Sequence, residues 1–189
     1  MKIIQICGTN GTGKTTLVKN LLKSGRFLKM SIQVDGKNRE WWFDGTVAIL
    51  GKYNDSNCCG IDAGNYSGET LQHAITRILS DYMPNVLLLE DIRYGSTYKF
   101  KKNLESKAKM FGYDYFAFAL IAKFETVSQR VYNRSKNINV DYDRIRSKAR
   151  QVVNSCRKLQ REGMSIVWVD TDEKDEKGVL SVLRGLIYG

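Results

Sequence analysis

Near its N-terminus the chain reads Ile-Ile-Gln-Ile-Cys-Gly-Thr-Asn-Gly-Thr-Gly-Lys-Thr over residues 3–15. The apolar residues before the first glycine predict a short buried strand, and leucines at helical spacing follow over residues 17–22. Between them, residues 8–15 satisfy the Walker A pattern Gly-x-x-x-x-Gly-Lys-Ser/Thr. A strand, a glycine-rich loop and a helix in this order predict a loop that wraps a phosphate group.

Each residue type in this loop has a physical reason to be there. Glycines let successive backbone N–H groups point at one phosphate, and the helix N-terminus adds positive potential. Lys14 is expected to reach the β- and γ-phosphates, and the Thr15 hydroxyl to face Mg²⁺. We therefore expect ATP and Mg²⁺ as cofactors; a glycine turn without a ligand is the alternative. The predicted ATP-binding residues are Gly8, Thr9, Asn10, Gly11, Thr12, Gly13, Lys14, Thr15 and Thr16.

The rest of the chain alternates strand-like and helix-like segments. Apolar runs predict strands over 46–50, 86–89, 115–122 and 165–169, and helical spacing predicts helices over 67–82, 101–110, 125–134, 142–161 and 177–187. Such alternation predicts an α/β fold with a parallel sheet of about five strands and helices on both faces. We expect one domain, residues 1–189, without internal repeats or linkers.

Composition excludes several classes of protein. Four Cys and one His among 189 residues make a disulfide scaffold or a structural zinc site improbable. No apolar stretch approaches the roughly 20 residues of a membrane span, so we expect a soluble, cytoplasmic protein without membrane contact. The net charge is +10, and the segment from residue 93 to residue 161 contains seventeen Lys and Arg but only five Asp and Glu. This spread favours a nucleic-acid polymer as partner, with a solvated basic surface as the alternative.

Two acids end the strand predicted over residues 86–89. Glu90 is expected to complete the metal site with Thr15, because Mg²⁺ prefers oxygen ligands. Asp91 and the nearby Arg93 are candidates for binding the acceptor of the phosphoryl group. The alternative for either acid is a cap on the following turn or helix.

The loop after the second predicted strand is a candidate acceptor site. It contains Lys52, Tyr53, the neighbouring Cys58 and Cys59, and Asp62. Phosphoryl transfer to a hydroxyl requires a base or orienting group opposite the glycine loop, and Asp62 is our candidate. A polar surface loop in which Asp62 makes an Asx turn is the alternative.

A lid-like helical region is expected over about residues 123–161. Arg130 and Arg134 lie one helical turn apart, so their guanidinium groups share one face and are placed to neutralise the transferring phosphate. The alternative is a solvated basic face of the helix. With Lys14 and Asp62, these arginines complete the predicted catalytic set.

Several of these segments together resemble the bacteriophage 5-hydroxymethyluracil DNA kinases. The resemblance is carried by the loop Cys-Gly-Thr-Asn-Gly-Thr-Gly-Lys-Thr-Thr-Leu-Val over 7–18, Leu-Gly-Lys-Tyr over 50–53, Cys-Cys-Gly-Ile-Asp over 58–62 and the strand ending in Glu90. The segment over 58–62 and the stretch Leu-Glu-Asp-Ile-Arg-Tyr over 89–94 depart from the family pattern, which puts details of the acceptor pocket in question. The resemblance implies a P-loop kinase of the nucleoside-kinase type that phosphorylates the 5-hydroxymethyl group of 5-hydroxymethyluracil in phage DNA, a step of thymine hypermodification in the host cytoplasm.

Two rival functions remain open at this point. The stretch from Glu90 to Tyr98 is also similar to the Asp-Arg-Tyr stretch of thymidylate kinases and the Glu-Arg-Ser stretch of deoxynucleoside kinases. That similarity implies a kinase for a small deoxynucleoside or its monophosphate. A P-loop ATPase that acts on DNA without phosphorylating it is the second rival, although the acceptor-like loop would then lack a purpose.

Overall fold

The computed structural model describes residues 1–53, 60–64, 66–91, 93–135 and 140–189. Along the chain the elements are β1 (Lys2–Cys7), α1 (Lys14–Ser24), β2 (Leu28–Val34), β3 (Lys37–Phe43), β4 (Val47–Leu50), the short 3-10 helix η1 (Asp62–Gly64), α2 (Gly68–Tyr82), β5 (Val86–Glu90), α3 (Tyr98–Met110), β6 (Asp114–Ile121), α4 (Phe124–Ser135), α5 (Tyr142–Arg161), β7 (Ser165–Asp170) and α6 (Glu176–Tyr188). Each strand and helix predicted from the sequence is present. No helix in the described ranges is long and apolar enough to cross a membrane.

A single sheet of seven strands runs through the molecule in the order β2-β3-β4-β5-β1-β6-β7. The five strands from β4 to β7 pair in parallel, as the alternation of strands and helices predicts. Strand β1 lies in the middle of this parallel part, hydrogen-bonded to β5 on one side and to β6 on the other. The predicted α/β P-loop fold is confirmed.

The two additional strands form an antiparallel hairpin at one edge of the sheet, which the sequence analysis did not predict. Strands β2 and β3 pair from Leu28 with Phe43 to Val34 with Lys37. The connecting Asp35 and Gly36 both have positive φ, 50° and 71°, as in the tight turn that Asp-Gly favours. This dipeptide between two runs of strand-forming residues was the signal for the hairpin.

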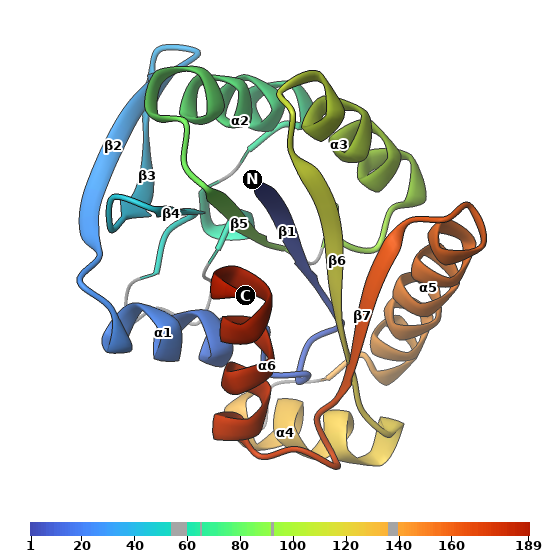
Figure 1. Cartoon of the computed structure of the whole chain (residues 1–189). Coiled ribbons are helices and arrows are strands. Elements are labelled where there is room, and N and C mark those ends of the chain that lie inside the picture. The colour runs from blue at the N-terminus through green and yellow to red at the C-terminus, as the bar shows by residue number, and fades with distance from the viewer. Residues whose placement is uncertain (54–59, 65, 92, 136–139) are drawn as a thin grey trace.

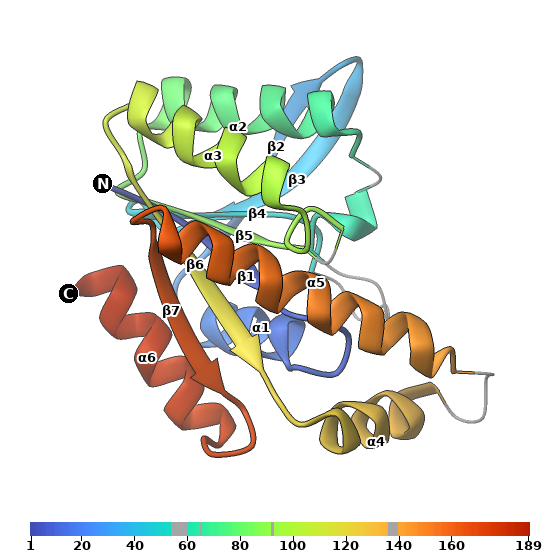
Figure 2. The ribbon, with the colours of Figure 1, turned by 90° about the vertical axis from the view of Figure 1, so that its right-hand side faces the viewer.

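Helices cover both faces of the sheet (Figure 1). On one face, α2, α3 and α5 bury Leu71, Leu104 and Val152 in one apolar cluster. On the other face, α1 and α6 bury Leu17 and Leu183 in a second cluster. Helix α4 lies apart from both, beyond the carboxyl end of β6, next to the start of α5 (Figure 2).

The topology opens a crevice at the carboxyl edge of the parallel strands. The chain leaves β1 toward α1 on one face of the sheet, and leaves the neighbouring β5 toward α3 on the opposite face. Loops that diverge in this way from adjacent strands create the usual ligand site of open α/β sheets. The glycine loop follows β1 and Glu90 ends β5, so both lie at this point.

Candidate active site

The loop between β1 and α1 has the backbone of a phosphate cradle. Gly11 and Gly13 have φ of 84° and 87°, in the left-handed region that favours glycine. At Gly11 a Cβ atom would lie 2.7 Å from the carbonyl oxygen of Val127, so only glycine allows α4 to pack this closely on the loop. Gly13 caps α1 without a side-chain hydrogen bond, which leaves the first N–H groups of the helix for an anion.

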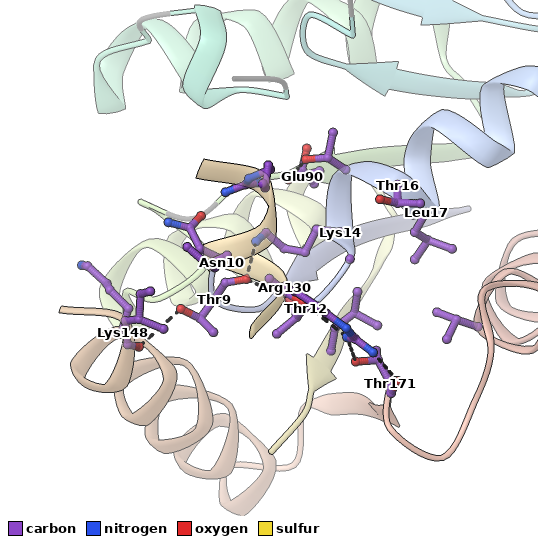
Figure 3. A pocket seen from close by; sticks show the side chains of 18 of the residues that line it. Thr9, Asn10, Thr12, Lys14, Thr16, Leu17, Glu90, Arg130, Lys148 and Thr171 are labelled. Carbon is purple, nitrogen blue, oxygen red and sulfur yellow. Dashed lines mark hydrogen bonds between the residues drawn. The ribbon is translucent and has the colours of Figure 1, made fainter. Parts of the chain in front are cut away.

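Lys14 lies inside the site rather than in solvent. Its side chain is 4% exposed, and its Nζ donates to the carbonyl oxygen of Thr9 at 3.0 Å (Figure 3). Burial lowers the pKa of Lys14, while the carboxylates of Glu90, Asp91 and Asp62 act in the opposite direction. The ammonium group is therefore held over the loop, close to three acids and a carbonyl oxygen.

Glu90 meets Thr15 at the other side of the loop. The Thr15 hydroxyl donates to Glu90 Oε1 at 3.2 Å, whereas Oε2 is buried without a hydrogen-bond partner among the described residues. Burial raises the pKa of Glu90 to about 7, the charges of Asp91 and Asp62 add to this, and the charge of Lys14 opposes it. A buried carboxylate oxygen without a partner, beside a threonine hydroxyl, fits Mg²⁺, which takes hard oxygen ligands.

The described residues of the chain do not supply a complete set of metal ligands. The described ranges contain no group of three His, Cys, Asp or Glu that would hold a metal alone. Thr15 and Glu90 would thus share Mg²⁺ with nucleotide phosphates and water, as is usual for this ion. When bound there, Mg²⁺ supplies positive charge to the phosphate oxygens.

The loop after β4 returns to the end of β5 and brings Asp62 to the cavity. Lys52 and Gly60 exchange backbone hydrogen bonds of 3.1 and 2.8 Å, and Ile61 N donates to the carbonyl oxygen of Glu90 at 3.1 Å. Gly60 contacts the Glu90 carboxylate so closely that a Cβ atom would collide with it. Asp62, the first residue of η1, lines the cavity, and its charge raises the pKa of both Glu90 and Asp91.

The predicted acceptor residues divide into two groups. Asp62 and Arg93 line the cavity, whereas Lys52, Tyr53 and Asp91 do not. The backbone of Lys52 closes the loop described above, and Tyr53 is packed in the apolar cluster around α1 and α6. Cys58 and Cys59 lie outside the described residues.

Asp91 is a buried structural group rather than a surface of the cavity. It is 1% exposed and accepts hydrogen bonds from Gln5 Nε2, at 3.2 Å, and from Gly95 N. Burial raises its pKa to about 6 although the Gly95 hydrogen bond opposes the shift. Direct contact between Asp91 and an acceptor is thus not supported; the carboxylate instead holds the turn that carries Arg93.

A cavity of about 1370 Å³ opens over the glycine loop. Eight of the nine predicted ATP-binding residues, 9–16, line it, and Gly8 does not. Arg130 and Arg134 of α4 line its outer wall. Arg130 also joins two loops, donating to the carbonyl oxygen of Gly11 at 3.3 Å and to the hydroxyl and carbonyl oxygens of Thr171 at 3.0 Å each.

Two parts of the cavity wall were missed. Arg144 and Lys148 of α5 line it, and so do residues of the segment that joins β7 to α6: Thr171, Asp172, Lys174 and Asp175. Helix α5 is held at the loop because Thr9 Oγ1 donates to the carbonyl oxygen of Ile145 at 3.4 Å (Figure 3). The i, i+4 spacing of Arg144 and Lys148 was a signal, but many basic pairs in this segment share it.

The fold and the glycine loop define a P-loop nucleotide-binding protein, and the similarity to a phage kinase makes the chain a phosphotransferase of the kinase type. No model of a protein family matches the chain. The 5-hmdU DNA kinase of Delftia phage PhiW-14 is 29% identical to it over 182 residues, which cover 90% of this chain and 68% of the relative. The resemblance to these phage kinases that the sequence motifs indicate is thereby confirmed.

Solved structures support the same fold at low sequence identity. The YorR protein of Bacillus subtilis, in complex with phosphorylated GDP, superposes with a TM-score of 0.59 at 14% identity, covering 98% of this chain and 95% of YorR. The deoxyadenosine kinase of M. mycoides, with the products dCMP and dCDP bound, gives a TM-score of 0.51 at 12% identity, covering 97% of each chain.

Proposed function

We propose that this protein transfers the γ-phosphoryl group of ATP to the primary hydroxyl of 5-hydroxymethyluracil in DNA. The observation that carries the proposal is the meeting of Lys14, Thr15 and Glu90 with Asp62 at one cavity, because these residues supply both sides of a phosphoryl transfer. The similarity to a 5-hmdU DNA kinase supports the acceptor. That relative is a phage protein, and we assign the reaction to the cytoplasm of an infected host.

On the donor side, the loop and α1 bind the triphosphate. The N–H groups of residues 11–16 and the Lys14 ammonium surround the β- and γ-phosphates, and Lys14 exchanges its present hydrogen bond to Thr9 for a phosphate oxygen. Thr15 and Glu90 hold Mg²⁺, for which Glu90 must be ionised. Positioning and charge compensation of this kind provide most of the rate enhancement in phosphoryl transfer.

On the acceptor side, Asp62 orients the hydroxyl and accepts its proton as the oxygen attacks the γ-phosphorus. The bond between the γ-phosphorus and the β–γ bridging oxygen breaks, so that ADP leaves and a phosphate monoester forms on the base. Arg130 and Arg134 compensate charge on the transferring group, and the region over about 123–161 acts as a lid that excludes water. The base must leave the helical stack, or be presented single-stranded, to reach the cavity.

A small-molecule kinase is the second candidate function. Arg93 favours it, because this arginine lines the cavity on a turn that buried Asp91 holds in place, where it can bind one phosphate or sugar of a free nucleotide. Neither the glycine loop nor Glu90 distinguishes the two candidates. Only the acceptor does.

The deciding experiment offers labelled ATP with three acceptors: DNA containing 5-hydroxymethyluracil, the corresponding free monophosphate and the free nucleoside. We expect label in the DNA. Unmodified DNA of the same sequence is the control, and it stays unlabelled because its bases lack the 5-hydroxymethyl group. Label in the monophosphate or nucleoside alone overturns the DNA proposal in favour of the small-molecule kinase, and ATP hydrolysis stimulated by unmodified DNA without labelled acceptor indicates an ATPase.

A further inference from the structure

The outer face of α5 carries a row of four arginines, Arg146, Arg150, Arg157 and Arg161, which we call the arginine stripe. All four side chains are exposed. Successive members are separated by four, seven and four residues, so at 3.6 residues per turn they lie on one face of the helix. The stripe is about 22 Å long at 1.5 Å per residue.

The stripe points away from the protein core. Helix α5 packs on the sheet through Val152, Cys156 and Leu159, which are buried on its opposite face. Asp143 is the single acid of the helix on the stripe's side. Packing therefore leaves the four arginines exposed along one face of the helix.

The four arginines of the stripe also lack acidic partners among the described residues. Within the described ranges, no ion pair joins any of the four to an acid, and Arg146 lies over the Phe124 ring at 4.3 Å. The two arginines of each i, i+4 pair repel each other, and such a pair destabilises an isolated helix by a few tenths of a kcal/mol. An anion bound along the stripe would remove this repulsion.

The neighbouring flank of α5 behaves differently. There Lys158 lies over the Tyr98 ring at 3.9 Å, and Glu162 is paired with Lys102 at 3.3 Å and hydrogen-bonded by the Tyr98 hydroxyl. These charges and rings satisfy one another between α3 and the end of α5. On this flank the basic charges thus have partners, whereas the four arginines of the stripe have no ion pair among the described residues.

The stripe begins beside the active-site cavity. In the first half of α5, Arg144 and Lys148 line the cavity, while Arg146 and Arg150 line a smaller hollow of about 410 Å³ on the other side of the same turns. From there the helix extends away from α4 along the molecule (Figure 2). A strand that leaves the cavity across α5 thus meets the stripe immediately.

We propose that the arginine stripe binds the sugar-phosphate backbone of the DNA strand that flanks the acceptor nucleotide. The inference rests on the proposed function and adds the surface by which the polymer is held. A row of guanidinium groups suits phosphates, since each presents paired donors in a plane and retains its charge at any working pH. Such contacts are independent of base sequence and release counterions, so the binding must weaken steeply with salt.

The test is the affinity of the intact protein for a fluorescent single-stranded DNA without the modified base, measured by anisotropy across about 50 to 200 mM salt. Two double variants divide the stripe, Arg146→Ser with Arg150→Ser, and Arg157→Ser with Arg161→Ser. The second pair is remote from both the cavity and Phe124, so its effect is free of any disturbance of α4. The matched control, Lys177→Ser with Arg184→Ser, removes the same charge from exposed positions of α6 on the other face of the sheet.

We expect each stripe variant to lose about ten-fold or more in DNA affinity, and its log-log salt slope to become shallower by about 1.4, the value for two phosphate contacts. Nucleotide binding should stay unchanged, and the control should bind DNA nearly as the wild type does. Equal loss in the control, or no loss in the stripe variants, overturns the inference. An acidic peptide that competes more strongly than DNA of equal charge also overturns it.

This outcome is separable from that of the proposed function. If DNA is phosphorylated but the stripe variants bind it normally, the assignment of the stripe as the DNA-binding surface is wrong, whereas the assignment of DNA as the acceptor is correct. If the wild type labels only free nucleotides while the stripe still binds DNA, the acceptor assignment is wrong and the surface stands as a DNA site of another purpose.

Discussion

The glycine loop and the outer wall of the cavity are built in different ways. Within the loop, the hydrogen bonds that shape it are local, such as Lys14 Nζ to Thr9 O and Thr12 Oγ1 to the same oxygen at 2.9 Å. The outer wall joins distant segments: Arg130 contacts residue 11 and residue 171, and Asp62 reaches the cavity through the pairing of Lys52 with Gly60. Substitutions in the loop should therefore act through ATP binding and affect transfer to every acceptor, whereas substitutions in the wall should affect proton transfer from the acceptor, charge compensation and the assembly of the site.

The largest effect is expected from Lys14→Met, which keeps the length of the buried side chain and removes its charge. Transfer should fall about 10³-fold with any acceptor, because a charged donor to the transferring phosphate is lost. Turnover with labelled ATP measures this, and circular dichroism checks the fold. The control is Lys23→Met at the exposed end of α1. Loss limited to one acceptor would contradict the assignment of Lys14 to the donor side.

Asp62→Asn tests the proposed role of Asp62 as the base that accepts the proton of the acceptor hydroxyl. We expect kcat to fall by at least about 10²-fold, the contribution of a general base, while the affinity for ATP is retained. Asp91→Asn is the comparison: it disturbs the turn carrying Arg93 and should chiefly raise KM for the acceptor. A larger loss of kcat in Asp91→Asn than in Asp62→Asn would reverse these two roles.

Glu90→Gln tests the buried carboxylate on the donor side through the pH dependence of the Tm. In the protein without ligands, the pKa of Glu90 is about 7 against an ordinary 4.5, so the folded state binds its proton more tightly than the unfolded chain. The stabilisation from this group is present below pH 4.5 and is lost as pH rises through 7. The Tm of Glu90→Gln relative to the wild type should therefore rise between these pH values. A difference in Tm that stays flat with pH would mean that Glu90 is not held in this buried environment. With Mg²⁺ and ATP bound, the wild type should have the higher Tm of the two proteins. The reason is that Mg²⁺ binding requires the ionised carboxylate of Glu90.

Arg130→Ala and Arg134→Ala separate assembly of the wall from charge compensation. Both should lower kcat, by about ten-fold each, if both arginines stabilise the transferring group. Only Arg130→Ala should also lower Tm and ATP affinity, because its hydrogen bonds join the loop at Gly11 to Thr171. Thermal unfolding and nucleotide titration distinguish the two variants, and equal losses of Tm would contradict the bridging role of Arg130.

The smallest effect is expected far from the cavity, in the β2–β3 hairpin. Gly36→Ala adds a Cβ into open space, but at a φ of 71° it should lower the free energy of unfolding by about 1 kcal/mol. Kinase activity should be unchanged, since Asp35 and Gly36 of the turn are not among the residues that line the cavity. Denaturant unfolding and turnover assays check the two halves of this prediction, and a marked loss of activity would show that the hairpin takes part in the site.

The comparison also explains which parts of the molecule were predictable. The inner parallel strands were predictable because they contain apolar runs, such as residues 86–89, of the kind that is buried on both faces of a sheet. The hairpin was missed because its runs alternate exposed and buried residues, and Asp35 and Gly36 alone signal the turn. Asp91 was assigned to the acceptor since sequence position cannot tell which of two neighbouring acids faces the cavity.

The order of residues along the chain identified the phosphate loop, because the loop is one short segment whose glycines allow the left-handed backbone that the cradle requires. It also determined the fold class, through the period of the apolar residues. Tertiary structure alone decided that Arg144 and Lys148 line the loop's cavity, that Asp91 turns inward, and that the face of α5 with the four arginines is exposed. The physical reason is that these placements depend on which strands and helices pack together, and packing joins residues that are far apart in the sequence.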